Sequence, residues 1–576
     1  MKPPGTGAAP FATLLDALRA HAEAGVAHTV GAAEDVWLTY PDLWGRVGAC
    51  ATRLSTAGVR PGDHVAVEMG TSTAVLCAAL GVLASGAVLV PVGAVRSPRP
   101  DSVDSQRLMG VVRASGARWY LTPEDPETRR RMLGAYGAKV EVVPVEGLAA
   151  AGEVHALPGV VPEQAALLQF SSGSLAAPKG IVLSHRNLVA NMWAFLHRIG
   201  LLSGRGVTWL PLSHDMGLIG SFLGCLYGGS AFHASAPSMF VRDPLRWLEE
   251  MAAFGATHSS GPPFALDLVI RRAERSPARL AGLDLSALRA IVIGSERIPP
   301  HLCERFETVL APCGLRRHTL LPGYGLAENC LAVALREPLV PSSVIAADPV
   351  RLERGRLTQA ATDEAGPARA RPLIGHGEPL QGTEIRIVSS NGIPVGPGLV
   401  GEIRIGGDAA CQWLVGPDGS RRPARGPDGL VPTGDLGSFI DGELYVVGRI
   451  KETLKHAGRT IAPADVEQAA LDAAPDLLAA AAAVATGEED TADRLVLFLE
   501  VTRRLQPPEE ARLADGVRLA VLRDFGMPTQ AVYVGRRGAL PRTTSGKVRR
   551  LSLAGELRSG RLARCWSAVT LAAVPV

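Results

Sequence analysis

The chain has few of the features that mark secreted, zinc-stabilised or nucleic-acid-binding proteins. Its eight cysteines are scattered and none forms a C-x-x-C pair, which favours reduced thiols over disulfides or structural zinc. A net charge of +3 gives no reason to expect a nucleic-acid partner. The N-terminus lacks the charged-then-apolar order of a signal peptide, and we find no internal repeat. These absences predict a cytoplasmic protein.

Long apolar runs are also scarce. Residues 74–95 form one uncharged run long enough to span a membrane, but three glycines and a proline interrupt it. We therefore predict a buried helix from Thr73 to Ala84 and a buried strand from Ala87 to Pro91, and no membrane span. A second apolar run, Pro475 to Ala485, starts with a proline that suits a first helical turn. We predict a helix there, packed on a small sheet.

The remaining composition is that of a globular protein with more than one domain. The 576 residues are 47% hydrophobic and 20% charged, which predicts two or three domains. Helical and strand patterns alternate over residues 11–335, as in parallel sheets covered by helices. Residues 373–449 instead show short strands between Gly/Pro turns, which indicates an antiparallel, barrel-like subdomain, although the Arg421 to Asp428 stretch is predicted to be a surface loop. A compact α/β domain follows Lys451.

The most informative segment is residues 169–180, Q-F-S-S-G-S-L-A-A-P-K-G, between predicted strands at 165–170 and 181–183. Such a turn exposes backbone N–H groups and hydroxyls around a concavity that suits phosphate oxygens, and Lys179 adds a positive charge. The spacing is not that of a P-loop, and an ordinary Gly/Ser hairpin is the alternative.

This loop resembles the phosphate-binding loop of the adenylate-forming superfamily, which includes acyl-CoA synthetases, luciferases and peptide-synthetase adenylation domains. Further segments match that superfamily in the same order: G-Y-G-L-A-E from Gly323, P-T-G-D-L-G from Pro432, G-R-I-K-E from Gly448 and L-P-R-T-T-S-G-K from Leu540. The runs W-L-P-L-S-H-D-M-G-L-I-G from Trp209 and S-S-G-P-P-F-A from Ser259 are similar to those of fatty acyl-AMP ligases.

The resemblance implies a fold and a reaction. The fold is an α/β N-terminal domain, residues 1–450, of two sheet subdomains and a barrel-like subdomain, followed by a small mobile α/β domain, residues 451–576. In the reaction, a carboxylate attacks the α-phosphorus of ATP, which gives an acyl-adenylate and pyrophosphate. Repulsion between anions dominates that barrier, so catalysis needs positioning and cations rather than a covalent protein intermediate.

The resemblance also assigns roles to residues. Catalysis falls to Lys547, His214 and Glu328, where Lys547 contacts the substrate carboxylate and the α-phosphate and Glu328 holds Mg²⁺. Asp435 binds the ribose hydroxyls with help from Arg449, and Lys451 is the hinge. Tyr324 offers a flat face to the adenine. The other ATP contacts are expected from Ser171, Ser172, Gly173, Ser174, Lys179, Gly294, Ser295, Glu296, Gly323, Gly325, Leu326 and Ala327.

A further set is expected to form the acid-binding pocket beside His214. Its members are mostly apolar, which favours a lipid, terpenoid or aryl acid over a charged one. Two more, Met192 and Phe195, are equally well explained as helix core. The set is Asp215, Met216, Ile219, Ser260, Gly261 and Phe264.

Three functions stay open. The leading one passes the acyl group to an acyl carrier protein in lipid or natural-product biosynthesis. The second is an acyl-CoA ligase. Residues 340–372, a polar and irregular stretch where acyl-AMP ligases carry an insertion, argue against it if contacts from Arg351, Leu352 or Arg354 lock the small domain. The third is a nucleotide-binding protein that no longer adenylates, because Leu175-Ala176 replace the usual Thr-Gly of the phosphate loop.

Overall fold

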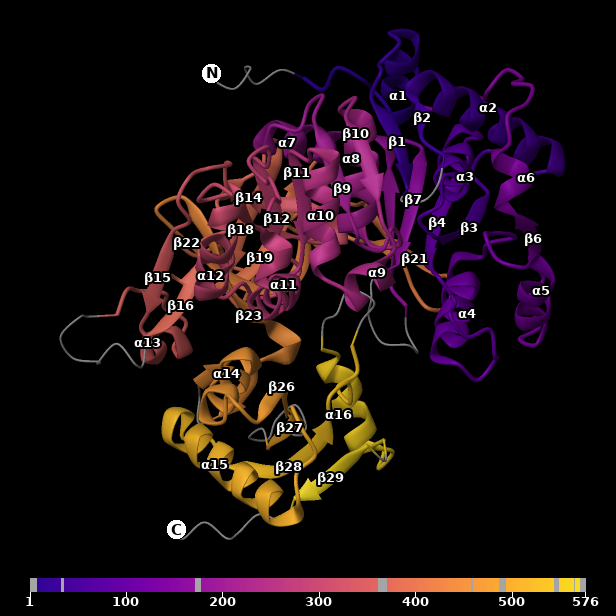
Figure 1. Ribbon diagram of the computed structural model, residues 1–576. Helices are drawn as coiled ribbons and strands as arrows, with labels where there is room; N and C mark the ends of the chain where they lie inside the picture. The colour runs from indigo at the N-terminus through magenta and orange to yellow at the C-terminus, as the bar shows by residue number, and fades with distance from the viewer. Residues whose placement is uncertain are drawn as a thin grey trace.

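The computed structural model describes residues 8–32, 36–170, 178–360, 370–456, 459–485, 494–542, 548–563 and 565–569. Figure 1 shows a large body, indigo to orange, and below it a smaller one, orange to yellow. The large body holds two mainly parallel sheets and an antiparallel sheet. The α/β fold predicted from the sequence is confirmed.

The first sheet carries the strands on either side of the segment that resembles a phosphate loop. Its strands from β7 to β6 pair in parallel, and β8 returns antiparallel to β7. Within the described residues the sheet runs in the order β21 (Arg421–Pro423), β20 (Trp413–Val415), β8 (Gly180–Ser184), β7 (Ala165–Phe170), β4 (Val88–Gly93), β3 (His64–Met69), β5 (Trp119–Thr122) and β6 (Glu141–Pro144). Because β21 is a paired strand, the loop predicted from Arg421 was wrong at its start.

The second sheet is parallel from β1 to β13 and antiparallel at the far edge, and only β2 pairs antiparallel at the other edge. Its order in the described part of the chain is β17 (Glu378–Pro379), β14 (Ala332–Leu335), β13 (Leu320–Gly325), β12 (Ala290–Ile293), β11 (His258–Gly261), β9 (Arg205–Thr208), β10 (Ala231–Ala234), β1 (Thr29–Ala32) and β2 (Leu38–Thr39).

Helices cover both sheets. The largest apolar cluster joins strands of both sheets to α1 (Leu14–Glu23), α2 (Tyr40–Ala57), α3 (Thr73–Ala84), α7 (His185–Ile199) and α8 (Gly224–Tyr227). The outer faces pack on α4 (Val103–Ser115) and α5 (Pro126–Gly134), and on α10 (Leu245–Phe254), α11 (Pro263–Arg275) and α12 (Pro300–Leu310). Short helices α6 (Val145–Ala149) and α9 (Pro237–Arg242) complete the body. Burial on both faces explains the continuous apolar runs of the strands.

The buried helix predicted at Thr73 is α3, and its bounds are those predicted. None of the helices in the described ranges is both long and apolar enough to cross a membrane. All eight cysteines are free thiols, as the absence of C-x-x-C pairs predicts.

The antiparallel sheet predicted within residues 373–449 is confirmed. It runs β18 (Thr383–Val388), β19 (Gly401–Gly407), β22 (Val431–Ile440), β23 (Glu443–Arg449). The stretch 340–372 is less irregular than predicted: β15 (Val344–Ala347) pairs with β16 (Arg371–Ile374), and α13 (Pro349–Glu353) lies between them in the chain. Leu352 of α13 packs with Ile345, Leu373 and Tyr445, so this insertion shares a small core with β23 of the third sheet.

The small body is a second α/β unit. Its sheet runs β26 (Leu478–Ala485), β27 (Leu495–Val501), β28 (Thr529–Arg536), β29 (Trp566–Val569), beside α14 (Pro463–Ala473), α15 (Pro507–Phe525) and α16 (Arg550–Arg558). A short hairpin, β24 (Leu454–His456) and β25 (Arg459–Ile461), precedes it.

The helix predicted from Pro475 to Ala485 was wrong, because this run forms β26. Ala481 and Ala483 enter the apolar cluster beneath α14 and α15, whereas Ala482 and Val484 enter the cluster beneath α16. Alternate residues thus face opposite sides, and both sides are buried. A strand of this kind shows no polar alternation, and tertiary packing overrides the helical propensity of alanine.

Candidate active site

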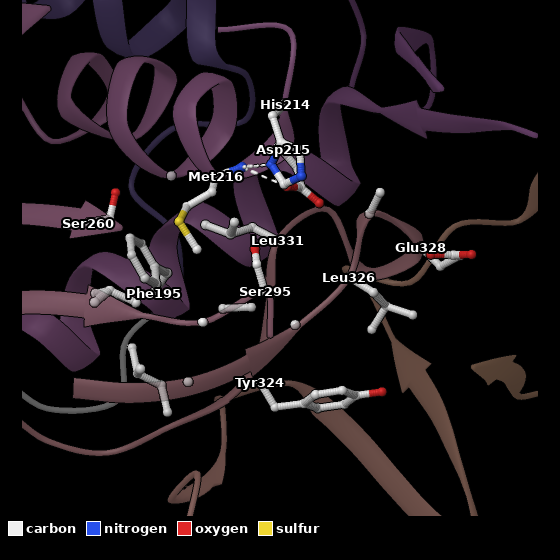
Figure 2. A pocket seen from close by; sticks show the side chains of 18 of the residues that line it. Phe195, His214, Asp215, Met216, Ser260, Ser295, Tyr324, Leu326, Glu328 and Leu331 are labelled. Carbon is white, nitrogen blue, oxygen red and sulfur yellow. Dashed lines mark hydrogen bonds and ion pairs between the residues drawn. The ribbon is translucent and has the colours of Figure 1, made fainter. Parts of the chain in front are cut away.

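One cavity of about 690 Å³ lies at the carboxyl ends of β12 and β13, where open α/β sheets bind their ligands. The third sheet contributes Thr433, Gly434 and Arg449, and the small body contributes Lys451 at its start and Leu551 in α16. Figure 2 shows this cavity from close by, with Tyr324 at one side and Phe195 and Ser260 at the other. The cavity therefore joins the two bodies of the molecule.

Three hydrogen-bonded side chains, two of them buried and the third exposed, connect three strands at the polar end. The Tyr324 hydroxyl on β13 donates to Asp435 Oδ2 on β22 at 2.9 Å, and Arg449 Nε on β23 donates to Asp435 Oδ1 at 2.7 Å. Burial, and then the Asp435 carboxylate, raise the pKa of Tyr324 well above its usual range, so the phenol stays neutral. The same carboxylate raises the pKa of Arg449. Asp435 is 5% exposed and lies behind the residues that line the cavity.

Beside these three side chains, the Lys179 ammonium group and the Glu328 carboxylate face each other. Lys179 Nζ lies 2.6 Å from Glu328 Oε1, and both residues line the cavity. No group of three or more metal-ligating side chains occurs in the described part of the chain. Mg²⁺ in nucleotide sites commonly takes only one or two carboxylates and draws its other ligands from phosphates and water. The single Glu328 carboxylate, 13% exposed and turned to the cavity, fits that donor set.

Glycines keep the backbone close to the cavity wall. A Cβ on Gly325 would collide with the carbonyl group of Leu331, and a Cβ on Gly294 would lie 3.1 Å from the Gly323 carbonyl oxygen. Ser295 has φ 74°, a left-handed conformation that a non-glycine residue seldom adopts. Such strained positions cluster at functional sites, where surrounding structure holds them.

His214 and Asp215 begin the wall that leads away from the polar end. His214 Nδ1 lies 2.6 Å from Asp215 Oδ1, and the same oxygen accepts from the Met216 N–H at 2.7 Å. Asp215 thereby caps η1 (Met216–Leu223), a π-helix with one extra residue per turn. In Figure 2, Met216 separates His214 and Asp215 from Ser260 and Phe195.

The far end of the cavity is mainly apolar. Phe195, Ile199 and Leu201 line it from α7 and the turn that follows, and Val207 lines it from β9. Sequence reasoning named Phe195 but missed Gly206, Ser221, Cys225, His258 and Leu331, which also line the cavity. These residues come from five separate segments, and only the tertiary fold brings them together.

The structure separates the predicted site residues into three sets. Lys179, His214, Asp215, Met216, Ser260, Gly294, Ser295, Gly323, Tyr324, Gly325, Leu326, Ala327, Glu328, Arg449 and Lys451 all line the cavity. The described residues Met192, Ile219, Gly261, Phe264 and Glu296, like Asp435, are not among its lining. Ser171, Ser172, Gly173, Ser174 and Lys547 lie outside the described residues.

Two of those exceptions have clear positions. Ile219 is fully buried in the main core, one turn of η1 away from the cavity-lining Met216. Phe264 packs edge-on against Trp209, with ring centroids 6.2 Å apart, in the outer cluster of the second sheet. The sequence motif therefore contains packing residues as well as lining residues.

Two sheets with inner and outer helices, a small C-terminal body and a cavity between them form the architecture of adenylate-forming enzymes. Residues 18–412 match the family model described as AMP-binding enzyme, and the chain belongs to that family.

The relatives agree with this assignment. Long-chain-fatty-acid–AMP ligase FadD26 of Mycobacterium tuberculosis is 31% identical over 552 residues, which covers 91% of each chain. A relative from Mycobacterium leprae, provisionally named fatty-acid–CoA ligase fadD21, is 32% identical over 69% of this chain and 71% of its own. A solved structure from work on fatty acyl-adenylate ligases of E. coli and L. pneumophila has a TM-score of 0.86 and 27% identity, and covers 97% of this chain and 99% of that one.

Proposed function

We propose that this enzyme uses ATP to convert an apolar carboxylic acid into an acyl-adenylate and releases pyrophosphate. One observation carries the proposal: a single cavity has charged groups, Lys179, Glu328 and Arg449, at one end and apolar side chains at the other. An acyl-adenylate has the same division, with a polar nucleotide and an apolar chain. The names of the relatives FadD26 and fadD21 support the same class of substrate.

The chemistry asks the protein for charge and position. The carboxylate oxygen forms a bond to the α-phosphorus while the bond from that phosphorus to the bridging oxygen of pyrophosphate breaks. In this proposal Lys179 and Arg449 offset negative charge at the nucleotide, and His214 lies beside the incoming carboxylate. Glu328 would hold Mg²⁺, which when bound offsets phosphate charge.

Lys547 is proposed to bring a third cation from the small body. Described residues on either side of it support that role: Arg542 and Val548 pair as a β-bridge. Leu551, four residues beyond Lys547, lines the cavity. The small body thus reaches the cavity through Leu551, which supports the proposal for Lys547.

Adenylation is tested by ATP–pyrophosphate exchange with a panel of fatty, terpenoid and aryl acids. We expect exchange that depends on an apolar acid and is absent with short charged acids. Tight nucleotide binding without exchange for any acid would instead favour the nucleotide-binding alternative.

We propose further that the acyl group passes to the phosphopantetheine thiol of a carrier protein rather than to free CoA. Ion pairs between the insertion and the small body support this: Arg459 Nη1 lies 3.2 Å from Glu353 Oε2, and Arg371 Nη1 lies 2.8 Å from Asp465 Oδ2. Arg351 and Arg354, which the sequence suggested for this role, are exposed. Thioester yield with a carrier protein against free CoA decides the acceptor, and efficient acyl-CoA formation would favour the CoA-ligase alternative.

A further inference from the structure

The apolar part of the cavity contains a pair of serine hydroxyls. Ser221 Oγ on η1 and Ser260 Oγ on β11 lie 3.2 Å apart, and both residues line the cavity. Ser260 is only 7% exposed. Their neighbours in the wall, Phe195, Val207 and Met216, are apolar. A polar pair in such a wall calls for a physical reason, because burying a hydroxyl without a full set of hydrogen bonds costs free energy.

Ser259, which precedes Ser260 in β11, also lines the cavity, but its hydroxyl is used within the core. Successive side chains of a strand point to opposite faces. Ser259 uses its hydroxyl within the core: it donates to the Val207 carbonyl at 2.7 Å and accepts from Trp247 Nε1 at 2.9 Å. Ser260 has no such bond to the core, and its single hydrogen-bond partner among the described residues is Ser221.

The donors and acceptors of the two hydroxyls determine which ligand group the pair can bind. Ser221 Oγ also donates to the Met216 carbonyl oxygen at 3.2 Å. If Ser221 donates there, Ser260 donates to Ser221, and both hydroxyl hydrogens are used. What the pair then offers to the cavity is lone pairs on Ser260 Oγ, because a hydroxyl has one donor and two acceptor positions. A ligand group that donates an O–H completes this chain, whereas a carbonyl oxygen does not.

We infer that Ser221 and Ser260 form a recognition point for a hydroxyl group on the acyl chain, so that the preferred substrate is a hydroxylated apolar acid. This inference rests on the proposed adenylation of an apolar acid. In Figure 2 Ser260 lies on the far side of Met216 from His214, so the hydroxyl belongs along the chain and away from the carboxylate.

The test uses ATP–pyrophosphate exchange with a fatty acid, its positional monohydroxy isomers and the matching keto acids. The wild-type enzyme is expected to favour at least one hydroxy isomer over the unsubstituted acid by about tenfold in kcat/KM, the effect of one neutral hydrogen bond in a dry site. The matching keto acid should show no such preference.

Ser260→Ala tests the pair itself, because it keeps the width of the cavity and removes only the oxygen. We expect this variant to lose most of the preference, measured as the ratio of kcat/KM for the hydroxy acid to kcat/KM for the unsubstituted acid. Ser221→Ala should act in the same direction. Ser259→Ala is the matched control: it should lower the melting temperature and leave the ratio between hydroxy and unsubstituted acids unchanged.

The outcomes separate the two levels of the argument. If no acid supports exchange, the proposed function fails. If the unsubstituted acid is adenylated and no hydroxy isomer is favoured, or if the preference survives both Ser260→Ala and Ser221→Ala, adenylation stands and the hydroxyl recognition point is overturned.

Discussion

Apolar packing holds each of the two bodies together, whereas ion pairs connect one body to the other. Each apolar cluster in the described part of the chain lies wholly on one side of Lys451. Across that boundary the molecule uses charge. Asp465 of α14 forms ion pairs with Arg371 of the insertion and with Arg297 elsewhere in the large body. Arg459 of the small body forms an ion pair with Glu353.

This difference teaches how the site can be both rigid and adjustable. The polar end of the cavity is formed by residues at the ends of strands in the large body. Close packing in that body fixes the side-chain positions to within a narrow range. The small body has its own core and a polar interface, and relative motion is the default for domains joined in this way. The domain boundary near Lys451 and its role as a hinge stay predictions.

Lys547→Ala gives the largest expected effect, because it removes the one cation that the small body is proposed to bring to the chemistry. Adenylation should fall on the order of a thousandfold, while ATP binding to the large body stays measurable. Exchange kinetics and calorimetry measure the two quantities. Lys455→Ala, which removes another ammonium group from the same body, is the control and should stay within a few-fold of wild type. A normal rate in Lys547→Ala would remove this residue from the mechanism.

Acid should destabilise the large body in a defined pH window. Burial lowers the pKa of His185, His258 and His376 from 6.5 to about 4. Between these values the unfolded chain binds more protons than the folded one, so the free energy of unfolding falls as pH decreases from about 6.5 to about 4. Each histidine contributes at most about 3 kcal/mol.

The window is measured by urea unfolding, followed by tryptophan fluorescence, at pH values from neutral to acid. Seven of the eight tryptophans lie in the large body, and a Trp566→Phe background makes the signal report that body alone. His376→Gln should reduce the fall in the free energy of unfolding below pH 6.5 by the contribution of this one histidine. Unfolding free energies that do not change across the window would show that these histidines are not buried as neutral groups.

Asp435→Ala should weaken binding of ATP and AMP by roughly tenfold to a hundredfold, because Arg449 loses its partner and the ribose loses the acceptor that we propose for it. The effect belongs to the large body, so the interface ion pairs should be unaffected. Calorimetry measures affinity, and a melting curve separates lost binding from lost structure. Asp435→Asn keeps the side-chain shape, and its nucleotide affinity should lie between those of the wild type and of Asp435→Ala. Equal nucleotide affinity in all three proteins would refute the ribose assignment.

Lys451→Pro tests the hinge. Proline fixes φ near about −65°, so it should hold the two bodies in one relative orientation. We expect adenylation and acyl transfer to change unequally, by several-fold, when each half-reaction is assayed by itself. Lys451→Ala removes the side chain without fixing the backbone and should leave the ratio of the two rates close to wild type. Equal loss of both activities in the proline variant would indicate misfolding.

Asp465→Asn gives the smallest expected effect, because it weakens the interface and leaves both cores intact. Arg371 is buried enough that its pKa falls to about 10, so it depends on this carboxylate for compensation. A bias of about 1 kcal/mol between orientations changes their ratio about fivefold, and thioester yield with free CoA should rise by a similar factor. Asp472→Asn, at an exposed position of the same helix, is the control. An unchanged yield would mean that these ion pairs do not restrict the acceptor.

The sequence predicted the large body well and the small one less well. Strands β7 and β8 and helix α3 fall where their patterns placed them, because parallel strands buried on two faces and a glycine-bounded apolar helix have distinct signatures. The strand β26 has the composition of a helix, and only its pairing with β27 reveals it. Pairing of β15 with β16, separated by more than twenty residues of chain, also leaves no local signal.

Site prediction divides in the same way. Motif residues such as Tyr324, Arg449 and Glu328 were predicted because a motif is local in sequence, and the structure brings them to one cavity. The apolar end was predicted poorly. Ser221, Cys225 and His258 acquire a shared position only through the packing of η1 on β9 and β11, which no single segment encodes.

The π-helix η1 makes the substrate wall open to change by length as well as by substitution. A π-turn carries one residue more than an α-turn, so removing one residue from Met216–Leu223 would let the segment close into an α-helix. Residues after the deletion would keep their face, because the segment loses the one residue by which a π-turn exceeds an α-turn, while residues within the segment would each shift by one position along the wall. The strands that hold the nucleotide end would keep their register. A single deletion would therefore exchange the residues that η1 presents to the cavity, leave the wall residues of α7, β9 and β11 in place, and give laboratory selection a direct route to a differently shaped acid pocket.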